Sequence, residues 1–181
     1  EDGKSVWACV KVSDGCKNCY SEALAKRYGR GGPFTVGATA KVTPYFDEAE
    51  AKALLSPKRL PAGSKVFIGD MTDVFGPWVP DDLLDRLFAV FALRPDVVFQ
   101  VLTKRPERMR EYLTANGGGI WGCHGCRRPQ DHLPLANCWL GTSVEDQAAA
   151  DKRFPELLAT PAAVRFLSCE PLLSELHLED Y

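Results

Sequence analysis

The chain passes from an apolar run into a charged turn and then a helical pattern in the stretch Val97-Val98-Phe99-Gln100-Val101-Leu102-Thr103-Lys104-Arg105-Pro106. The apolar run is rich in β-branched and aromatic residues, which predicts a buried β-strand. Pro106 suits the first turn of a helix, because the φ angle of proline is already helical. A strand that leads through a short polar turn into a helix is the repeating unit of parallel α/β proteins. This stretch therefore predicts the fold class.

The same alternation extends outward on both sides. It predicts further strands at residues 65–69, 137–141 and 164–167. Helices are expected at about 20–28 and 47–55, and three more are expected to begin at Pro80, Pro106 and Ser143. Asn18 is the expected N-cap of the first helix, Ser143 that of the last, and the segment 35–43 is expected to be extended. We expect residues 1–181 to form one domain with a mainly parallel sheet and a Cys- and His-containing insertion at about 116–138.

Composition narrows the classes of function. The 181 residues are 45% hydrophobic with a net charge of −2, which does not favour strong nonspecific binding to nucleic acid. No apolar run reaches the 18 or so residues that a membrane-spanning helix needs. The 7 cysteines exclude a fully paired disulfide framework, and their clustering favours metal or redox sites in a reducing compartment. We therefore expect a cytoplasmic protein without a membrane partner.

Three of the cysteines, Cys9, Cys16 and Cys19, lie on one short segment with the spacing C-x6-C-x2-C. A structural zinc site takes four ligands, whereas three thiolates suit an iron–sulfur centre with one position open. Two other interpretations stay open on spacing alone. The trio could bind zinc with Asp14 or a distant His, or Cys16 and Cys19 could form a redox pair at the start of a helix.

Charged and hydroxyl side chains follow every later strand, at the edge of the sheet where parallel α/β folds bind ligands. The cysteine segment precedes the first helix and is therefore expected at the same edge. The residues concerned are Asp70, Thr72, Lys104, Ser143, Glu145 and Glu170. Asp70, Asp73 and Glu145 could instead serve only as helix caps.

These motifs together resemble the radical S-adenosylmethionine (radical SAM) superfamily, and within it a short phage-associated branch similar in layout to spore photoproduct lyase relatives. The resemblance runs from about Trp7 to Leu173. Besides the cysteine segment it rests on four stretches, VFIGDMTD at 66–73, QVLTKRP at 100–106, WLGTSVED at 139–146 and RFLSCEPL at 165–172.

The resemblance implies a partial (β/α) barrel, shortened at both ends, that holds a [4Fe–4S] cluster on Cys9, Cys16 and Cys19. Its fourth iron would be chelated by the methionyl amine and carboxylate of SAM. Reduction of the cluster by an electron donor would then cleave SAM to methionine and a 5′-deoxyadenosyl radical that abstracts hydrogen from a substrate. If the chain is phage-encoded, the compartment is the host cytoplasm. Peptide, nucleoside, small-molecule and nucleic-acid substrates all stay open.

The same resemblance assigns roles to individual residues. Asp70 and Thr72 would contact the SAM amine, and Lys104 would pair with its carboxylate. Ser143 and Glu145 would hydrogen-bond the ribose. Tyr20 would pack on the adenine, and Glu170 would make a further contact with the cofactor.

A second group of potential ligands has the spacing C-x2-C-x5-H-x5-C and consists of Cys123, Cys126, His132 and Cys138. Two thiolates on one turn with a His and a Cys nearby predict a zinc site. An auxiliary iron–sulfur cluster is the alternative, and Cys138 could simply be a small buried hydrophobe. The competing hypothesis for the whole chain is a non-enzymatic, zinc-stabilised binding module that uses both cysteine groups structurally.

Overall fold

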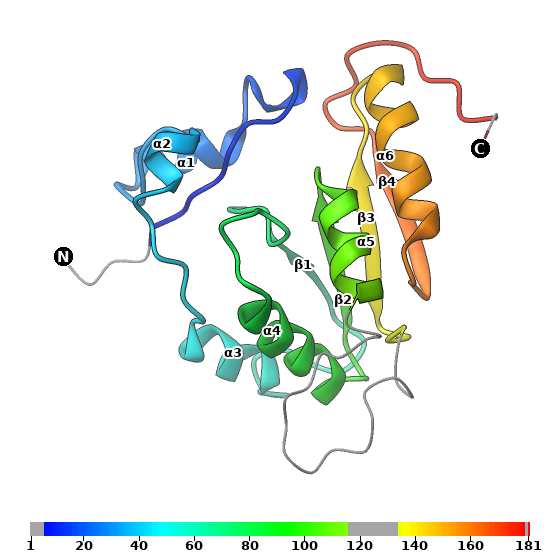
Figure 1. The fold of residues 1–181 in the computed structure, drawn as a ribbon. Helices are drawn as coiled ribbons and strands as arrows, with labels where there is room; N and C mark the ends of the chain where they lie inside the picture. Colours follow the sequence, from blue (N-terminus) through cyan, green and yellow to red (C-terminus); the bar gives the residue numbers. More distant parts are fainter. Residues whose placement is uncertain (1–5, 116–133, 180) are drawn as a thin grey trace.

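The computed structural model describes residues 6–115, 134–179 and 181 (Figure 1). Its centre is a four-stranded sheet in which the strands follow one another in sequence order. Every neighbouring pair is parallel. The strands are β1 (Lys65–Ile68), β2 (Val98–Thr103), β3 (Cys138–Ser143) and β4 (Val164–Ser168). The predicted α/β class with a parallel sheet is therefore confirmed.

Three helices follow β1, β2 and β3 and pack on one face of the sheet. They are α4 (Asp81–Leu93), α5 (Pro106–Ala115) and α6 (Gln147–Ala159). Alternate strand residues such as Phe99, Val101 and Leu140 point into a shared core with Phe88 of α4 and Leu157 of α6. Because side chains of a strand alternate between faces, this pattern places all three helices on the same side.

The opposite face carries the intervening strand residues. Phe67, Gln100 and Trp139 lie side by side there in the strand register. Phe67 is 45% exposed, and the Lys65 ammonium lies 5.0 Å from the centre of the Trp139 ring. This face is therefore not sealed by the core that covers the other side.

The N-terminal part of the chain forms short elements, most of which lie beside the carboxyl ends of the strands, whereas its last helix lies lower, next to α4 (Figure 1). Its elements are the 3-10 turn η1 (Asp14–Cys16), α1 (Tyr20–Arg27), α2 (Val36–Thr39) and α3 (Glu48–Leu55). The predicted helix at 47–55 is confirmed, and the Asp47 side chain caps it by accepting from the backbone N–H groups of Ala49 and Glu50. Helix α3 packs against α4.

Three local predictions were wrong. The segment 35–43 is not extended, because the Thr35 side chain accepts a hydrogen bond from the Ala38 N–H and caps α2. The N-cap of α1 is Cys19 and not Asn18. Ser143 does not start a helix, because it still pairs with Ser168 at the end of β3.

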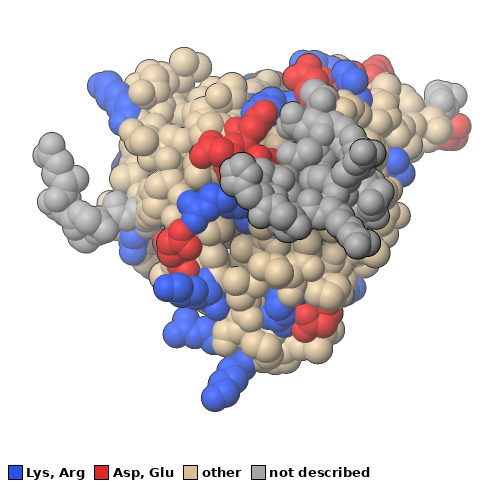
Figure 2. Space-filling view, turned by 60° about the horizontal axis from the view of Figure 1, so that its bottom comes forward, with Lys and Arg blue, Asp and Glu red and all other residues tan. Residues whose placement is uncertain are grey.

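The cap of α6 is Asp146, which accepts a 2.8 Å hydrogen bond from the Ala149 N–H. None of the helices in the described ranges combines the length and hydropathy needed to cross a membrane. On the face seen in Figure 2, basic and acidic side chains lie close to one another, in keeping with the nearly balanced charge. Ion pairs of this kind join Arg86 to Glu48 and Arg108 to Asp81.

Candidate functional site

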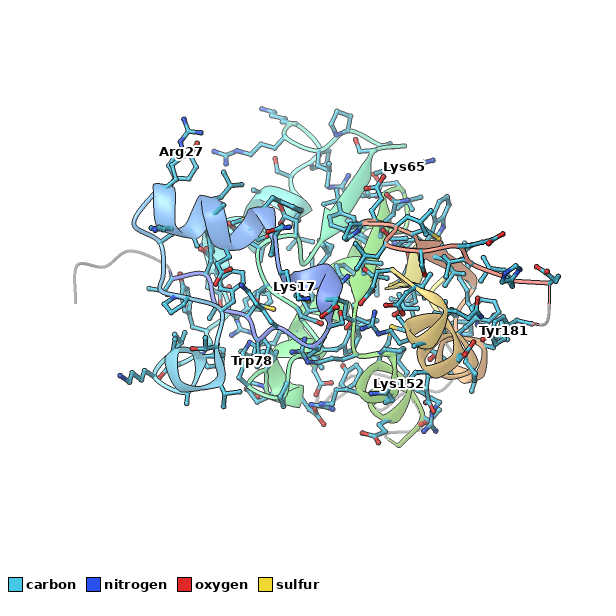
Figure 3. The ribbon with its side chains drawn as sticks, turned by 90° about the horizontal axis from the view of Figure 1, so that it is seen from above. Lys17, Arg27, Lys65, Trp78, Lys152 and Tyr181 are labelled. Atoms are coloured by element: carbon cyan, nitrogen blue, oxygen red, sulfur yellow. The ribbon has the colours of Figure 1, made fainter. Side chains whose placement is uncertain are left out.

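A cavity of about 550 Å³ lies at the carboxyl ends of the strands, beneath the segment that carries the first three cysteines. We call residues 8–19 the cysteine loop and this space the cysteine-lined cavity. Figure 3 looks down on it from above and shows the turn that carries Lys17 over the middle of the molecule. Side chains from the ends of all four strands reach the cavity wall.

The cavity brings together most of the residues that the sequence singled out. All three cysteines, Cys9, Cys16 and Cys19, lie on its wall. Six of the seven predicted cofactor-binding residues line it too, namely Tyr20, Asp70, Thr72, Lys104, Ser143 and Glu170. Glu145 is the seventh, and the structure places it behind the wall, where it is 0% exposed.

The first limb of the cysteine loop, residues 8–11, is held by hydrogen bonds to its backbone carbonyls. The Thr72 hydroxyl donates to the Ala8 carbonyl at 2.6 Å, and the Thr39 hydroxyl donates to the Cys9 carbonyl at 2.8 Å. Each donor comes from a different part of the chain. Thr72 therefore combines a position on the cavity wall with an anchoring hydrogen bond to the loop.

Arg105 supplies the third anchor of this limb. Its guanidinium donates to the Val10 carbonyl at 2.8 Å and to the Asp73 carboxylate at 2.7 Å. The same guanidinium lies over the Trp78 ring, 4.8 Å from the ring centre. Asp73 is itself buried and accepts a 2.7 Å hydrogen bond from the Thr103 hydroxyl. Asp73 and Arg105 both follow predicted strands, but neither was among the residues predicted to bind the cofactors.

The second limb of the loop, residues 13–19, packs against the side chain of Glu145 through Gly15. This carboxylate pairs with Arg153 of α6 at 2.8 Å, and the Lys104 ammonium lies 3.9 Å away. Burial alone would raise the pKa of Glu145, but hydrogen bonds from Ser13 and Arg153 and the positive charges of Arg153 and Lys104 hold that pKa below its usual value. Glu145 is therefore an anion, buried between the loop and α6.

The cysteine thiols are partly buried and unpaired. Burial raises the pKa of the Cys9 thiol and the Asp73 carboxylate raises it further, while Arg105 acts in the opposite direction. The Ser13 hydroxyl lies 3.8 Å from the Cys16 sulfur. Within the described ranges, no three Cys, His, Asp or Glu side chains converge closely enough to hold a metal ion.

The donor set on the cavity wall nevertheless fits a three-thiolate metal centre in its chemistry. Three part-buried thiols face one space that also holds a cation and carboxylates. Metal affinity depends on deprotonated thiols, and sites of this kind form fully only with the metal present. The thiols of Cys9, Cys16 and Cys19 would therefore have to move together on binding.

The second cysteine group falls mostly outside the part of the chain that the structure describes. Cys123, Cys126 and His132 lie in residues 116–133, which are not described. Cys138 lies in β3, 3% exposed, and packs in the core. Burial raises the pKa of its thiol to about 12. This is the environment that the alternative interpretation of Cys138, a small buried hydrophobe, anticipates.

Residues 4–180 match the family model described as "Protein of unknown function (DUF5131)". No curated protein and no solved structure matches the chain.

Proposed function

We propose that this chain, which belongs to the DUF5131 family, is a radical SAM enzyme that holds a [4Fe–4S] cluster on Cys9, Cys16 and Cys19 and SAM in the cysteine-lined cavity. The cluster, when bound and reduced, would supply the electron that cleaves SAM to methionine and a 5′-deoxyadenosyl radical, chemistry that no protein side chain provides. The protein's own part is to bind, orient and shield the two cofactors.

One observation carries the proposal. A single cavity is lined by the three cysteines, by Tyr20 at the start of α1 and by five residues at the ends of the four strands, spread from residue 9 to residue 170. The sequence alone assigned them to one cofactor pair through its resemblance to the superfamily. Their meeting at one wall is what a shared ligand requires. Parallel strands bring their carboxyl ends together in any such sheet, so the cysteines and Tyr20, which come from outside the sheet, carry the most weight.

The charges on the cavity wall suit the methionyl end of SAM. Asp70 follows β1 and Lys104 follows the neighbouring strand β2, so an anion and a cation stand at adjacent strand ends. The Lys104 ammonium is 3.9 Å from Glu145, longer than a hydrogen bond, and its side chain is 18% exposed. Lys104 can therefore donate to a carboxylate in the cavity while Asp70 accepts from an amine.

The topology supports the barrel-like arrangement that the resemblance implies. The strand order follows the chain and the three crossover helices share one face of the sheet. In a doubly wound sheet the strand order reverses and helices cover both faces. In a (β/α) barrel the strands follow the chain order and the helices lie on one face, as they do here. We therefore propose that the sheet is part of a (β/α) barrel whose interior is the face with Phe67 and Trp139.

The experiment is anaerobic reconstitution with iron and sulfide, followed by reduction in the presence of SAM. We expect brown protein with about four irons per chain, as one [4Fe–4S] cluster requires. We also expect release of 5′-deoxyadenosine. Alanine at Cys9, Cys16 or Cys19 should abolish both. Cys169→Ala is the matched control, because Cys169 is equally part-buried and unpaired but is not assigned to the cluster.

The competing zinc-stabilised module predicts a different result. Reconstituted protein that stays colourless, retains zinc and leaves SAM intact would overturn the proposed function. Loss of the cluster in Cys169→Ala but not in Cys16→Ala would overturn the ligand assignment.

A further inference from the structure

We propose that Arg105, held by Asp73, is a positioning residue for the first limb of the cysteine loop, so that the place of Cys9 depends on a buried ion pair at the ends of β1 and β2. The proposal rests on the proposed function only in taking Cys9 as a metal ligand. Arg105 also lines the cysteine-lined cavity, but the positioning role acts through the loop backbone, by way of its hydrogen bond to the Val10 carbonyl.

The contacts of Arg105 form a bridge between three segments. One nitrogen of the guanidinium donates to Asp73 at 2.7 Å and another donates to the Val10 carbonyl at 2.8 Å. The side chains are 13% and 8% exposed for Arg105 and Asp73, so the pair is largely desolvated. Contact with the Trp78 ring fixes the plane of the guanidinium.

Asp73 is rigid because its carboxylate is nearly saturated with donors. Besides Arg105, it accepts from the Thr103 hydroxyl at 2.7 Å, from the Phe75 N–H at 3.0 Å and from the Lys104 N–H at 3.2 Å. Two of these donors belong to the end of β2, while Asp73 itself follows β1. The orientation of Arg105 is therefore set by the sheet.

Asp73 also lies near Cys9. Both lie on the wall of the cysteine-lined cavity, and the Asp73 carboxylate is close enough to act on the Cys9 thiol electrostatically. The peptide group between Val10 and Lys11 is held at both ends, since the Val10 carbonyl accepts from Arg105 and the Lys11 N–H donates to the Phe34 carbonyl at 3.4 Å. Loss of Arg105 would release this peptide group and, with it, the Cys9 side of the loop.

The second limb has separate supports. The Lys17 N–H donates to Asp14 within the η1 turn, and Gly15 packs on Glu145. An effect that spreads equally to both limbs would therefore indicate general loosening. An effect confined to the first limb would indicate positioning.

The chain offers a matched control in Arg94. This buried arginine pairs with Asp96 at 2.8 Å and donates to the carbonyls of Leu54 and Leu60 at 2.6 and 2.7 Å. It resembles Arg105 in burial, in its acidic partner and in its backbone acceptors. It precedes β2, at the end of the sheet away from the cysteine loop.

The test compares Arg105→Gln, Arg105→Lys and Arg94→Gln by residue-resolved hydrogen exchange of the cofactor-free protein. We expect Arg105→Gln to speed exchange of the Lys11 amide by about tenfold, because a hydrogen bond from a charged donor is lost. The Lys17 amide should stay within about twofold of wild type. Arg105→Lys should give an intermediate rate, and Arg94→Gln should leave both amides unchanged.

The amount of iron bound per chain is a second readout. After reconstitution, Arg105→Gln should bind less iron per chain than Arg94→Gln at equal thermal stability and show an altered cluster EPR signal. If Arg105→Gln fails to fold, the comparison of Arg105→Lys with Arg94→Lys keeps the inference testable, because Lys keeps the charge but loses the bidentate geometry. Equal acceleration at Lys11 and Lys17, or none at Lys11, would overturn this inference. Wild-type protein that binds no iron would overturn the proposed function and leave the exchange result to decide the inference alone.

Discussion

Gly15 of the cysteine loop lies directly against the buried side chain of Glu145. A Cβ at Gly15 would stand 3.1 Å from Cδ and 3.2 Å from Cγ of Glu145. The Glu145 side chain is fixed in turn by its 2.8 Å ion pair with Arg153. The second limb of the loop therefore rests on a buried anion, and only a residue without a side chain allows that approach.

Gly15→Ala should displace the loop and leave the fold intact. Glu145 is held by Arg153 and cannot yield easily, so the loop has to move by a few tenths of an ångström. We expect a loss of about 1 kcal/mol in the free energy of unfolding and reduced iron binding after reconstitution. Gly37→Ala is the control, because a Cβ at Gly37 meets nothing within 4 Å. Equal iron binding by Gly15→Ala and Gly37→Ala would contradict the prediction.

Removal of the Glu145 carboxylate should be far more costly. In Glu145→Ala the Arg153 charge would stay buried, with its side chain 6% exposed and its acidic partner gone. We expect the free energy of unfolding in urea to fall by about 3–5 kcal/mol. Replacing both partners, as in Glu145→Leu with Arg153→Met, should recover part of that loss, because no charge is left buried while the Ser143 carbonyl still loses its 2.7 Å hydrogen bond from Arg153. A double variant no more stable than Glu145→Ala would count against a mutual charge pair.

The sheet could be predicted from the sequence because its strands are short apolar runs that need no distant partner to be recognised. The stretch from Val97 to Pro106 illustrates this, since β2 and α5 fall within one or two residues of the predicted bounds. The prediction of an extended segment at 35–43 failed because a local capping hydrogen bond sets the structure there. Thr35 caps a four-residue helix in a segment whose β-branched residues favour an extended chain.

The cavity wall was predictable for a different reason. Residues such as Asp70 and Lys104 follow strands, and parallel strands bring their carboxyl ends together whatever the detailed packing. The supports of the loop were not predictable in this way. The burial of Glu145 depends on Arg153 of α6, and the role of Arg105 depends on the Val10 carbonyl, 95 residues away in the sequence. Only the folded chain reveals such contacts.

Asp96 should make stability depend on pH at the acidic end. The hydrogen bond and charge of Arg94 hold the pKa of Asp96 below its usual value. A carboxylate whose pKa is lowered by folding contributes stability above its unfolded pKa of about 3.9, and this contribution is lost as the pH falls through the lower folded value. The Tm difference between wild type and Asp96→Asn should therefore be constant near neutral pH and shrink below about pH 4. A difference that grows on acidification would contradict the assigned direction.

Gly141 should control the shape of the cavity through Phe166. A Cβ at Gly141 would lie 2.6 Å from two atoms of the Phe166 ring, and Phe166 lines the cysteine-lined cavity. Because the ring is the free end of the side chain, Gly141→Ala should turn it into the cavity without unfolding the sheet. We expect weaker SAM binding by calorimetry, by about tenfold if one well-packed contact worth about 1.4 kcal/mol is lost. The double variant Gly141→Ala with Phe166→Leu should restore binding, since the shorter side chain removes the clash. Undiminished binding by Gly141→Ala in cluster-loaded protein would mean that SAM does not reach the Phe166 side of the cavity.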